Sequence, residues 1–457
     1  MKKIILTLII FFLLPGITAA EEILKANVDS SDKVLYLSFY EAVNMAIREN
    51  KKLQAFKNRV NAREGFISVQ RGDFLPSVNF NQGFVWTNNP AEVFALKLNQ
   101  RNLTAGEFAG APASFNNPDP FTNFLSEITL EQSVYNKENS VNLKIAKNRY
   151  SAKENEYLRT REKVVLEVAR AYLNVKNAVN FVKVAQQSIE AAKEHKRIAN
   201  VRYENETGLY SDVLRTNTFL KKAEQRFVSV QKNYEIAKKA LGLAIGVTNS
   251  VETVDTVPEL QPLSLKAHKN NALNRSDIKA MEINYEKAKN KIKLQQALYY
   301  PKVTAGGNYR VYSEYAPFGF EGENFTLFGA LKWNLFNGRK KPNLVKIAEY
   351  ELKETKNMLE DARNLAEFEV FDAYQTVMEK QKNFELAIST LESAEEGMKL
   401  VEIRYKNSLS PIIDVLDAQL NLDQARADVA KSRNEYLFSL INLRYASGMI
   451  LNDFNLN

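Results

Sequence analysis

Apolar residues recur every seven positions along the segment from Leu166 to Gly246, a spacing typical of long helices that pack along their length. The repeating positions are Val168, Val175, Val182 and Ile189, with Ala171, Ala178, Ala185, Ala192 and Ala199 three places later. Small residues in a heptad seam allow a neighbouring helix to approach closely. A flanking apolar line through Val165, Tyr172 and Val179 indicates a neighbour on each side, as in a sheet or cylinder of helices. An ordinary helical bundle with a wide apolar face would give the same pattern.

The chain contains this segment twice. Shifted by 202 residues, the segment aligns without a gap on Phe368–Gly448, so that Arg202-Tyr203 matches Arg404-Tyr405. A long repeat of this kind predicts one structural unit that is built twice and packed on its own copy. Each copy is predicted to form two long antiparallel helices. The first helix, from about 140 to 203, would be roughly 95 Å long.

Before each helix pair the periodicity changes from helical to alternating. A helical pattern from about 37 to 70 stops at Leu75-Pro76-Ser77-Val78, because proline disfavours helix just before itself. Alternating apolar residues then predict a β-hairpin at about 76–135, with a long loop from about 88 to 120 that holds one short helical candidate. The second half repeats this plan with a helix from about Ser276 and a hairpin at about 301–336.

The four predicted strands are about ten residues long and have an apolar side that carries Phe, Tyr and Trp, which suits the wall of a membrane β-barrel. Four strands cannot close a barrel, and lipid does not tolerate an open sheet edge. Other copies of the chain must therefore complete the wall, and three copies would supply twelve strands. The alternative is a soluble hairpin domain that the helices cover.

These patterns divide the chain into a signal peptide at 1–20, a first structural repeat at 21–246, a linker at 247–265 and a second repeat at 266–457. The signal consists of Lys2-Lys3, an apolar run from Ile4 to Leu14, and the small residues Thr18-Ala19-Ala20. The apolar run is too short to span a bilayer as a helix. An uncleaved membrane anchor is the alternative, but we expect the mature protein to leave the cytoplasm without a transmembrane helix.

Charge and composition narrow the function further. The net charge of +8 is not concentrated in a basic block with interleaved aromatic residues, which argues against nucleic-acid binding. The chain has no cysteine, which excludes disulfides, thiol catalysis and a lipid anchor on cysteine. Of two histidines, His195 is predicted to lie on a solvated helix face. Because no metal-ligand spacing, nucleophile elbow or phosphate loop occurs, we predict no catalytic residue, no metal site, no cofactor and no enzyme activity.

The order of the elements and several motifs resemble the TolC family of outer-membrane efflux proteins. The most specific residues lie in the second copy and are Arg404-Tyr405, Ile413-Asp414-Val415-Leu416-Asp417-Ala418-Gln419, Ala425, Tyr436, Leu443 and Gly448. Their twin runs from Arg202-Tyr203 to Gly246, and Leu75-Pro76-Ser77-Val78 matches the family's entry to the hairpin. The resemblance covers nearly all of the mature chain.

The resemblance implies a mainly α fold with a membrane β-barrel portion. Long antiparallel coiled-coil helices would form a trimeric α-barrel, and two β-hairpins per protomer would contribute to a twelve-stranded β-barrel. The homotrimer would lie in outer-membrane lipid with its helical tunnel in the periplasm, as the passive exit duct of a tripartite efflux or type I secretion system. The tunnel would open when an inner-membrane pump and a periplasmic adaptor dock. The sequence does not specify the cargo, because selectivity in such systems lies with the pump.

The resemblance also implies a gate at the periplasmic helix tips, where each helix pair turns. Asp212, Asp414 and Asp417 would give nine carboxylates near the closed end of a trimer and would attract cations. Tyr203 and Tyr405 would brace neighbouring hairpins. The simpler alternative keeps the acids as first-turn residues that complement the positive end of a helix, and the tyrosines as core aromatics.

The second turn departs from the family pattern at two positions. Ser408 stands where glycine is usual, and Ser410 stands where a basic residue is frequent. We therefore expect the links that lock the gate to be rearranged. Ser410-Pro411 predicts a helix N-cap followed by proline at the first helical position.

The rival function is a periplasmic coiled-coil adaptor or scaffold without a barrel. It differs from the duct at the aromatic hairpins, because an adaptor would carry a small soluble β domain instead. A periplasmic enzyme is a third possibility, but no cluster of residues supports it.

Overall fold

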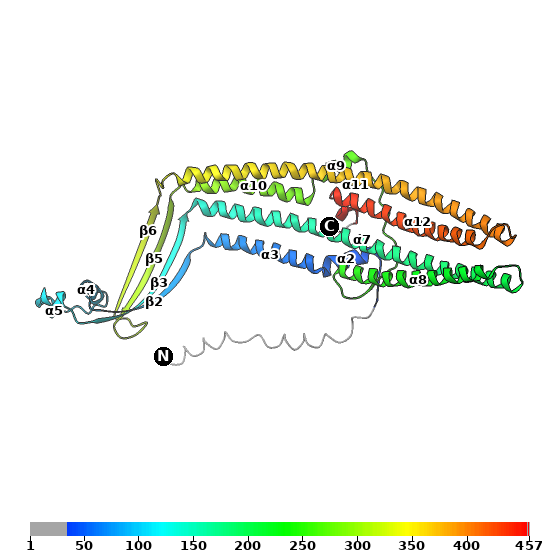
Figure 1. Cartoon of the computed structure of the whole chain (residues 1–457). Helices are drawn as coiled ribbons and strands as arrows, with labels where there is room; N and C mark the ends of the chain where they lie inside the picture. Colours follow the sequence, from blue (N-terminus) through cyan, green and yellow to red (C-terminus); the bar gives the residue numbers. More distant parts are fainter. Residues whose placement is uncertain (1–33, 455, 457) are drawn as a thin grey trace. The chain divides into compact units, whose positions relative to one another are not determined.

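The computed structural model describes residues 34–454 and 456, and the predicted signal peptide lies outside these residues. The chain divides into two compact units (Figure 1). The first unit contains the described residues up to Phe56, Leu158–Arg275 and the chain from Arg363 onward; the second contains Lys57–Tyr157 and Ser276–Ala362. Each unit therefore draws on both copies of the repeat. The repeat boundaries at 246 and 266 stay predictions.

Long helices dominate the chain, and with one antiparallel sheet they confirm the predicted mainly α class. The longest are α7 (Lys137–Glu204), α8 (Tyr210–Ile245), α11 (Lys340–Lys406) and α12 (Ile412–Ala446). The heptad seam of α7 is buried, with Val168, Val175 and Ala192 fully shielded from solvent. Among the described residues, no helix combines the length and the apolar character needed to cross a bilayer.

The helix predicted from about 37 to 70 is two helices, α2 (Phe39–Glu49) and α3 (Lys51–Gly72), which Asn50 separates. Asn50 has an extended backbone (φ −62°, ψ 115°), and its amide donates a 2.9 Å hydrogen bond to the Ala244 carbonyl. The prediction of one continuous helix is therefore wrong. The partner of Asn50 lies 194 residues away, a contact that local periodicity does not reveal.

The core of the first unit forms where segments from distant parts of the chain meet. Two short strands, β1 (Leu35–Leu37) and β4 (Val251–Thr253), pair in parallel, and β4 lies within the predicted linker at 247–265. The Tyr172 hydroxyl donates to the Leu37 carbonyl at 3.2 Å and to the Asp255 carboxylate. Burial, followed by the bond to Asp255, raises the pKa of Tyr172. Two short helices, α9 (Leu265–Ala272) and α13 (Ile450–Asp453), complete this unit.

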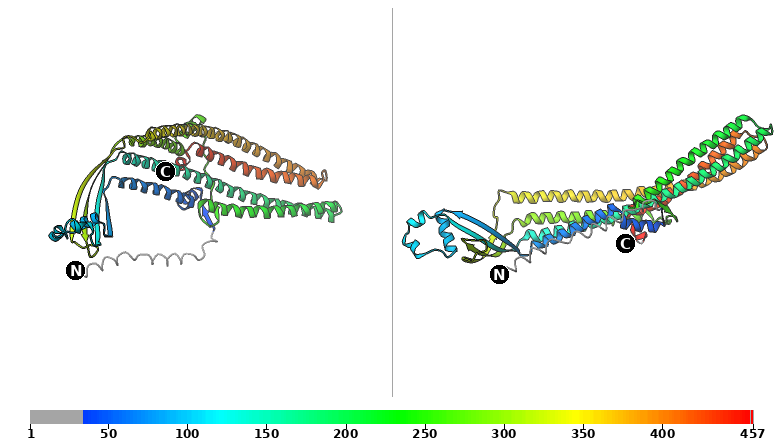
Figure 2. Two further views of the ribbon diagram at one scale, coloured as in Figure 1. Left: turned by 60° about the vertical axis from the view of Figure 1, so that its left-hand side comes forward. Right: turned by 90° about the horizontal axis from the view of Figure 1, so that it is seen from below.

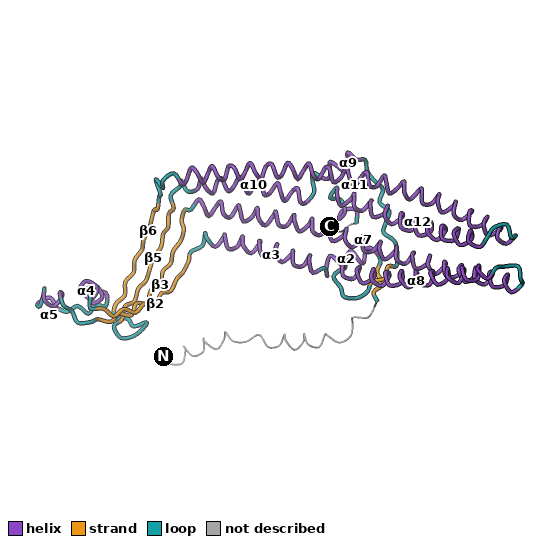
Figure 3. The backbone as a smooth tube through the Cα atoms, viewed as in Figure 1, coloured by secondary structure: helices purple, strands orange, loops and turns teal. Residues whose placement is uncertain are grey.

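The second unit contains a four-stranded antiparallel sheet (Figure 3). Its strands are β2 (Ser77–Thr87), β3 (Phe121–Tyr135), β5 (Lys302–Ser313) and β6 (Gly322–Lys332), in the order β2-β3-β5-β6. The pairing of β3 with β5 joins the two predicted hairpins. One register row carries Phe80, Ile128, Tyr309 and Phe325, and the next carries Asn79, Thr129, Asn308 and Thr326. The sheet therefore has one apolar and one polar face, and within the described chain the outer edges of β2 and β6 have no strand partner.

The segment from 88 to 120 is more ordered than the loop that the sequence predicts. It holds α4 (Pro90–Asn99), α5 (Ala105–Ala109) and α6 (Ala113–Asn116), of which only α4 was foreseen. Gln100 donates to the Asn123 side chain at 3.0 Å, which fixes the end of α4 to β3. A Cβ on Gly322 would lie 1.7 Å from the Asn99 carbonyl oxygen, so only glycine permits this approach to β6.

Four helical segments complete the second unit. They are α10 (Ser276–Ala297) and the parts of α3, α7 and α11 that belong to this unit. These segments lie side by side in both views of Figure 2. Lys291 of α10 and Glu351 of α11 form an ion pair at 2.9 Å, and Lys302 of β5 pairs with Glu138 of α7 at 2.8 Å.

Candidate functional site

The two helix pairs of the first unit turn through equivalent bends, where the sequence places the candidate gate (Figure 1). In the first bend Glu206 adopts a left-handed backbone (φ 62°), and the next N–H bonds back to the Arg202 carbonyl at 2.9 Å. In the second bend Ser408 does the same (φ 61°), and the next N–H bonds to the Arg404 carbonyl at 2.8 Å. Glycine adopts this conformation without steric cost, so a residue such as Ser408 keeps it at roughly 1–2 kcal/mol.

The start of α12 differs by one residue from the prediction. Pro411 is the N-cap, with an extended backbone (φ −73°, ψ 159°), and the helix begins at Ile412. The predicted N-cap Ser410 is therefore wrong, and its hydroxyl has no hydrogen-bond partner among the described residues. Helix ends are defined to within a residue or two by any criterion, so the local fold is otherwise as expected.

Arg202 joins the two hairpins at their tips. From α7 it donates to the Tyr405 carbonyl at 2.9 Å and to the Lys406 carbonyl at 3.1 Å, and its guanidinium carbon lies 4.4 Å from the centre of the Tyr405 ring. These carbonyls belong to the last turn of α11, at the partly negative end of the helix, and the Tyr405 carbonyl also accepts from the Ser408 N–H at 3.0 Å. The sequence marks Arg202 only as a repeat position. Its twin Arg404 is exposed, so the repeat itself gives no signal of the link.

The two candidate tyrosines lie in different environments. Tyr405 is 5% exposed and packs with Met398, Ile412 and Val415, and burial raises the pKa of its hydroxyl. Tyr203 is 47% exposed, with its ring centre 5.4 Å from that of Tyr210. Tyr405 therefore acts as a core aromatic that also seats Arg202, whereas Tyr203 lies on the surface of the first tip.

The three candidate aspartates occupy the first turns after the bends. The Asp212 N–H bonds to the Leu209 carbonyl at 3.0 Å, and the Asp414 N–H bonds to the Pro411 carbonyl at 3.2 Å. Asp414 and Asp417 are exposed, and Asp212 is half-buried. Within residues 34–454 no ion pair to any of the three carboxylates is present, so the local Asp212–Arg215 pair that the sequence allows is not formed.

A groove of about 530 Å³ runs between α8 and α12 close to these residues. Its α8 side carries Arg215, Lys222 and Arg226, and its α12 side carries Asp417. Apolar side chains complete the lining, namely Leu214, Phe219, Ile413, Leu416 and Leu420. Three cationic side chains and one carboxylate therefore line this groove.

His195 does not lie on a solvated face, and that prediction is wrong. It is 6% exposed, because its position on α7 falls between the buried seam residues Ala192 and Ala199. Burial lowers the pKa of the imidazole, against the opposing effects of Gln419 and Glu402. The side chain belongs to the packing between hairpins rather than to the surface.

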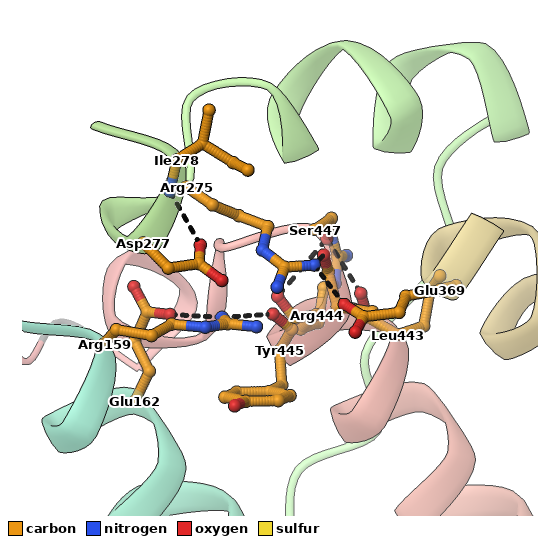
Figure 4. A network of polar contacts seen from close by, with 11 residues as sticks. Arg159, Glu162, Arg275, Asp277, Ile278, Glu369, Leu443, Arg444, Tyr445 and Ser447 are labelled. Carbon is orange, nitrogen blue, oxygen red and sulfur yellow. Dashed lines mark hydrogen bonds and ion pairs between the residues drawn. The ribbon is translucent and has the colours of Figure 1, made fainter. Parts of the chain in front are cut away.

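The far end of α12 is held by two arginines, of which Arg275 is buried (Figure 4). Arg159 donates to the Tyr445 carbonyl at 2.8 Å, and Arg275 donates to the Ala446 carbonyl at 3.1 Å while pairing with Glu369. The carbonyls at the C-terminus of α12 are thus bound by cations, which complement the negative end of the helix dipole. Periodicity gives no sign of this network, since its members are scattered over the chain.

His268 joins the same end of α12 to α9. It is fully buried, its Nε2 accepts from the Leu263 N–H at 3.3 Å, and its Nδ1 therefore donates to the Ser447 hydroxyl at 3.1 Å. Burial, and then the charge of Arg444, lower the pKa of His268 to about 4. Over the described residues no group of three His, Asp or Glu side chains is arranged to hold a metal ion.

Comparison with known families gives one clear match. A family model described as "Outer membrane efflux protein" matches residues 42–247 and 269–449. The outer membrane protein TolC of Vibrio cholerae serotype O1 is 23% identical over 381 residues, which are 77% of this chain and 82% of that protein. The two matched ranges enclose both helix pairs and both β-hairpins.

Solved structures agree with this match at the level of the fold. CusC superposes with a TM-score of 0.77 at 15% identity over 93% of this chain and 95% of its own. The outer membrane protein VceC from Vibrio cholerae gives a TM-score of 0.73 at 17% identity, over 90% of this chain and 96% of its own. At such identities the likeness establishes the fold alone.

Proposed function

Because the chain belongs to the outer membrane efflux protein family, we propose that it is the exit duct of a tripartite efflux or type I secretion system. It is a TolC-like outer-membrane channel, with a β-barrel portion in the membrane and a helical tunnel in the periplasm. Transport through such a duct is passive, and the energy comes from the inner-membrane pump. A periplasmic adaptor joins pump and duct. The rival role of a barrel-free adaptor or scaffold has no support.

One observation carries the proposal. The sheet has only four strands, one apolar face, and two outer edges at β2 and β6 that have no strand partner among the described residues. Each unpaired backbone group in lipid costs several kcal/mol, so an open edge cannot face the membrane. Single-chain membrane barrels start at eight strands. Three copies of this sheet, joined β6 to β2, supply twelve strands and leave no edge.

We place the closed end of the duct at the helix tips. Arg202 holds the first hairpin against the second, and the exposed Asp414 and Asp417 lie next to this contact in the sequence. In a trimer, with Asp212, these residues bring nine carboxylates to one end of the tunnel. Converging carboxylates bind a multivalent cation more strongly than a monovalent one.

The test is current through purified protein in a planar bilayer, with trivalent lanthanum added on the periplasmic side. Replacing Asp414 and Asp417 by alanine removes six of the nine proposed carboxylates and should weaken lanthanum block by at least a hundredfold, which corresponds to about 2.8 kcal/mol. The trimer should keep its stability, because first-turn acids each contribute about 0.3–1 kcal/mol.

The matched control replaces two exposed aspartates of α11 that lie away from the tips, Asp361→Ala with Asp372→Ala. This variant has the same net charge as the gate variant, so it should keep the block of the unmodified protein. Unchanged block in the gate variant, or equal loss in the control, would show that the acids are helix-start residues and that the gate lies elsewhere.

A further inference from the structure

The second unit has a groove of about 410 Å³ that all four of its helical segments line. Each helix contributes one face at helical spacing. On α7 these residues are Asn142, Ile145, Ala146 and Arg149, and on α11 they are Leu344, Ile347, Ala348 and Glu351. α10 adds Lys291, Leu294 and Gln295, and α3 adds Phe66 and Gln70. The four segments lie side by side (Figure 2), and the groove touches all of them.

The groove has an apolar floor and walls. Ile145, Ala146 and Ala348 are buried beneath it, whereas Phe66 is 38% and Ile347 is 54% exposed. Exposed apolar side chains beside a buried apolar floor gain free energy when a hydrocarbon or aromatic body covers them, at about 25 cal/mol per Å². The groove therefore suits an apolar body rather than a hydrated ion alone.

Positive charge gathers at one side of this apolar surface. Arg149 and Lys291 line the groove, and Lys287 lies one helical turn before Lys291 on α10. Burial, and then the charges of Arg149 and Lys291, lower the pKa of the Lys287 ammonium, so the three cations interact. The carboxylate that lines the groove is Glu351, which pairs with Lys291 at 2.9 Å. Glu156 lies close enough to act on Lys287. An excess of cations remains beside the groove.

We propose that this groove binds an amphipathic organic anion, whose apolar body covers Phe66 and Ile347 and whose acidic headgroup lies between Arg149 and Lys291. Guanidinium and ammonium groups pair with sulfonate, carboxylate and phosphate oxygens through charge-assisted hydrogen bonds. The inference rests on the proposed duct in one respect: the side of the helix layer that carries the groove is taken to face the lumen of the closed ring. The groove then lies on the path of the cargo, and its ligand indicates the chemical class of that cargo.

The test measures ligand binding to the trimer in nanodiscs by calorimetry, with naphthalene-1-sulfonate as the probe. Naphthalen-1-ylmethylammonium has a similar body and the opposite charge. We expect one sulfonate per protomer and at least tenfold weaker binding of the ammonium compound. The double variant Arg149→Gln with Lys291→Gln should bind the sulfonate at least tenfold more weakly, and Ile347→Ser should also weaken it.

The control variant Lys144→Gln with Lys293→Gln removes two exposed cations of the same two helices that do not line the groove. It should bind the sulfonate within twofold of the unmodified protein. An equal loss of sulfonate binding in both double variants would show that the net charge alone decides the affinity. Equal and undiminished binding in both would show that the sulfonate does not bind in this groove. Calorimetry requires no current, so a failed site is distinguished from a failed duct, which the bilayer experiment reports separately.

Discussion

Equivalent residues of the two repeat copies have different roles at the tips. Arg202 binds the end of α11 through two carbonyls and one aromatic ring, whereas Arg404 at the matching position is exposed. The donor of this contact belongs to the first hairpin, and the carbonyls that accept belong to the second. In the proposed gate, the second hairpin leaves the first on opening, and Arg202 would then stabilise the closed form.

Replacing Arg202 by glutamine should therefore favour the open form. Charge-assisted hydrogen bonds contribute about 1.5–3 kcal/mol, and the half-exposed position of Arg202 places the loss at the lower end, near a tenfold shift in the closed-to-open ratio. Resting current per channel in a planar bilayer should rise. The variant Arg404→Gln removes the same charge from the exposed twin and should leave the current unchanged. Equal currents in the two variants would rule out the link.

His268 predicts how stability depends on pH. Its pKa of about 4 in the folded protein lies below the unfolded value near 6.5, so the unfolded chain binds more protons between these values. The stabilisation is complete above pH 6.5 and falls by up to roughly 3 kcal/mol as the pH drops to 4. Thermal unfolding midpoints should therefore fall more steeply over this window in the unmodified protein than in His268→Gln. Parallel curves would exclude His268 as the cause.

The contacts of single residues were harder to predict than the part of the fold in which those residues lie. The repeat and the motifs indicated the tips correctly, and Asp212, Asp414 and Tyr405 lie beside the bends. They could not indicate Arg202 as the link, nor the burial of His195, because both depend on which helix packs against α7. The roles of the five candidate gate residues stay predictions that the current measurements test.

At the scale of elements, local chemistry predicted that the helical pattern stops before Pro76, and α3 ends at Gly72. Gly246 and Gly448 end the two pairs in left-handed conformations (φ 102° and 72°). Elements that depend on distant contacts were missed, such as the break at Asn50 and the three-residue strands β1 and β4. A strand of three residues is too short to show a period of two, and its partner here lies more than two hundred residues away.

Gly246 offers a sharp test of this end geometry. A Cβ there would lie 2.7 Å from both the Asn50 Cα and the Glu49 carbonyl oxygen, and the left-handed backbone adds roughly 1–2 kcal/mol of strain. Gly246→Ala should therefore lower the unfolding midpoint. In the control Gly397→Ala, the new methyl meets nothing within 4 Å in the interior of α11, and this variant should be stabilised by about 0.5–1 kcal/mol. The reverse order of midpoints would contradict this account of the cap.

At the scale of the whole molecule, one protomer is incomplete. Its sheet has an apolar face and two unpaired edges within the described residues, and its helix tips carry exposed carboxylates. Both features are explained when copies of the chain close into a ring, since the edges then pair and the tips converge. Four strands per chain give twelve in the trimer that the family resemblance implies.

The most direct test of this assembly is the native mass of the protein extracted from outer membranes in mild detergent. We predict a single species of three mature chains that survives dilution of the protein, because separation would expose six unpaired strand edges. A stable folded monomer, or full release of the protein with the soluble periplasmic fraction, would contradict the account.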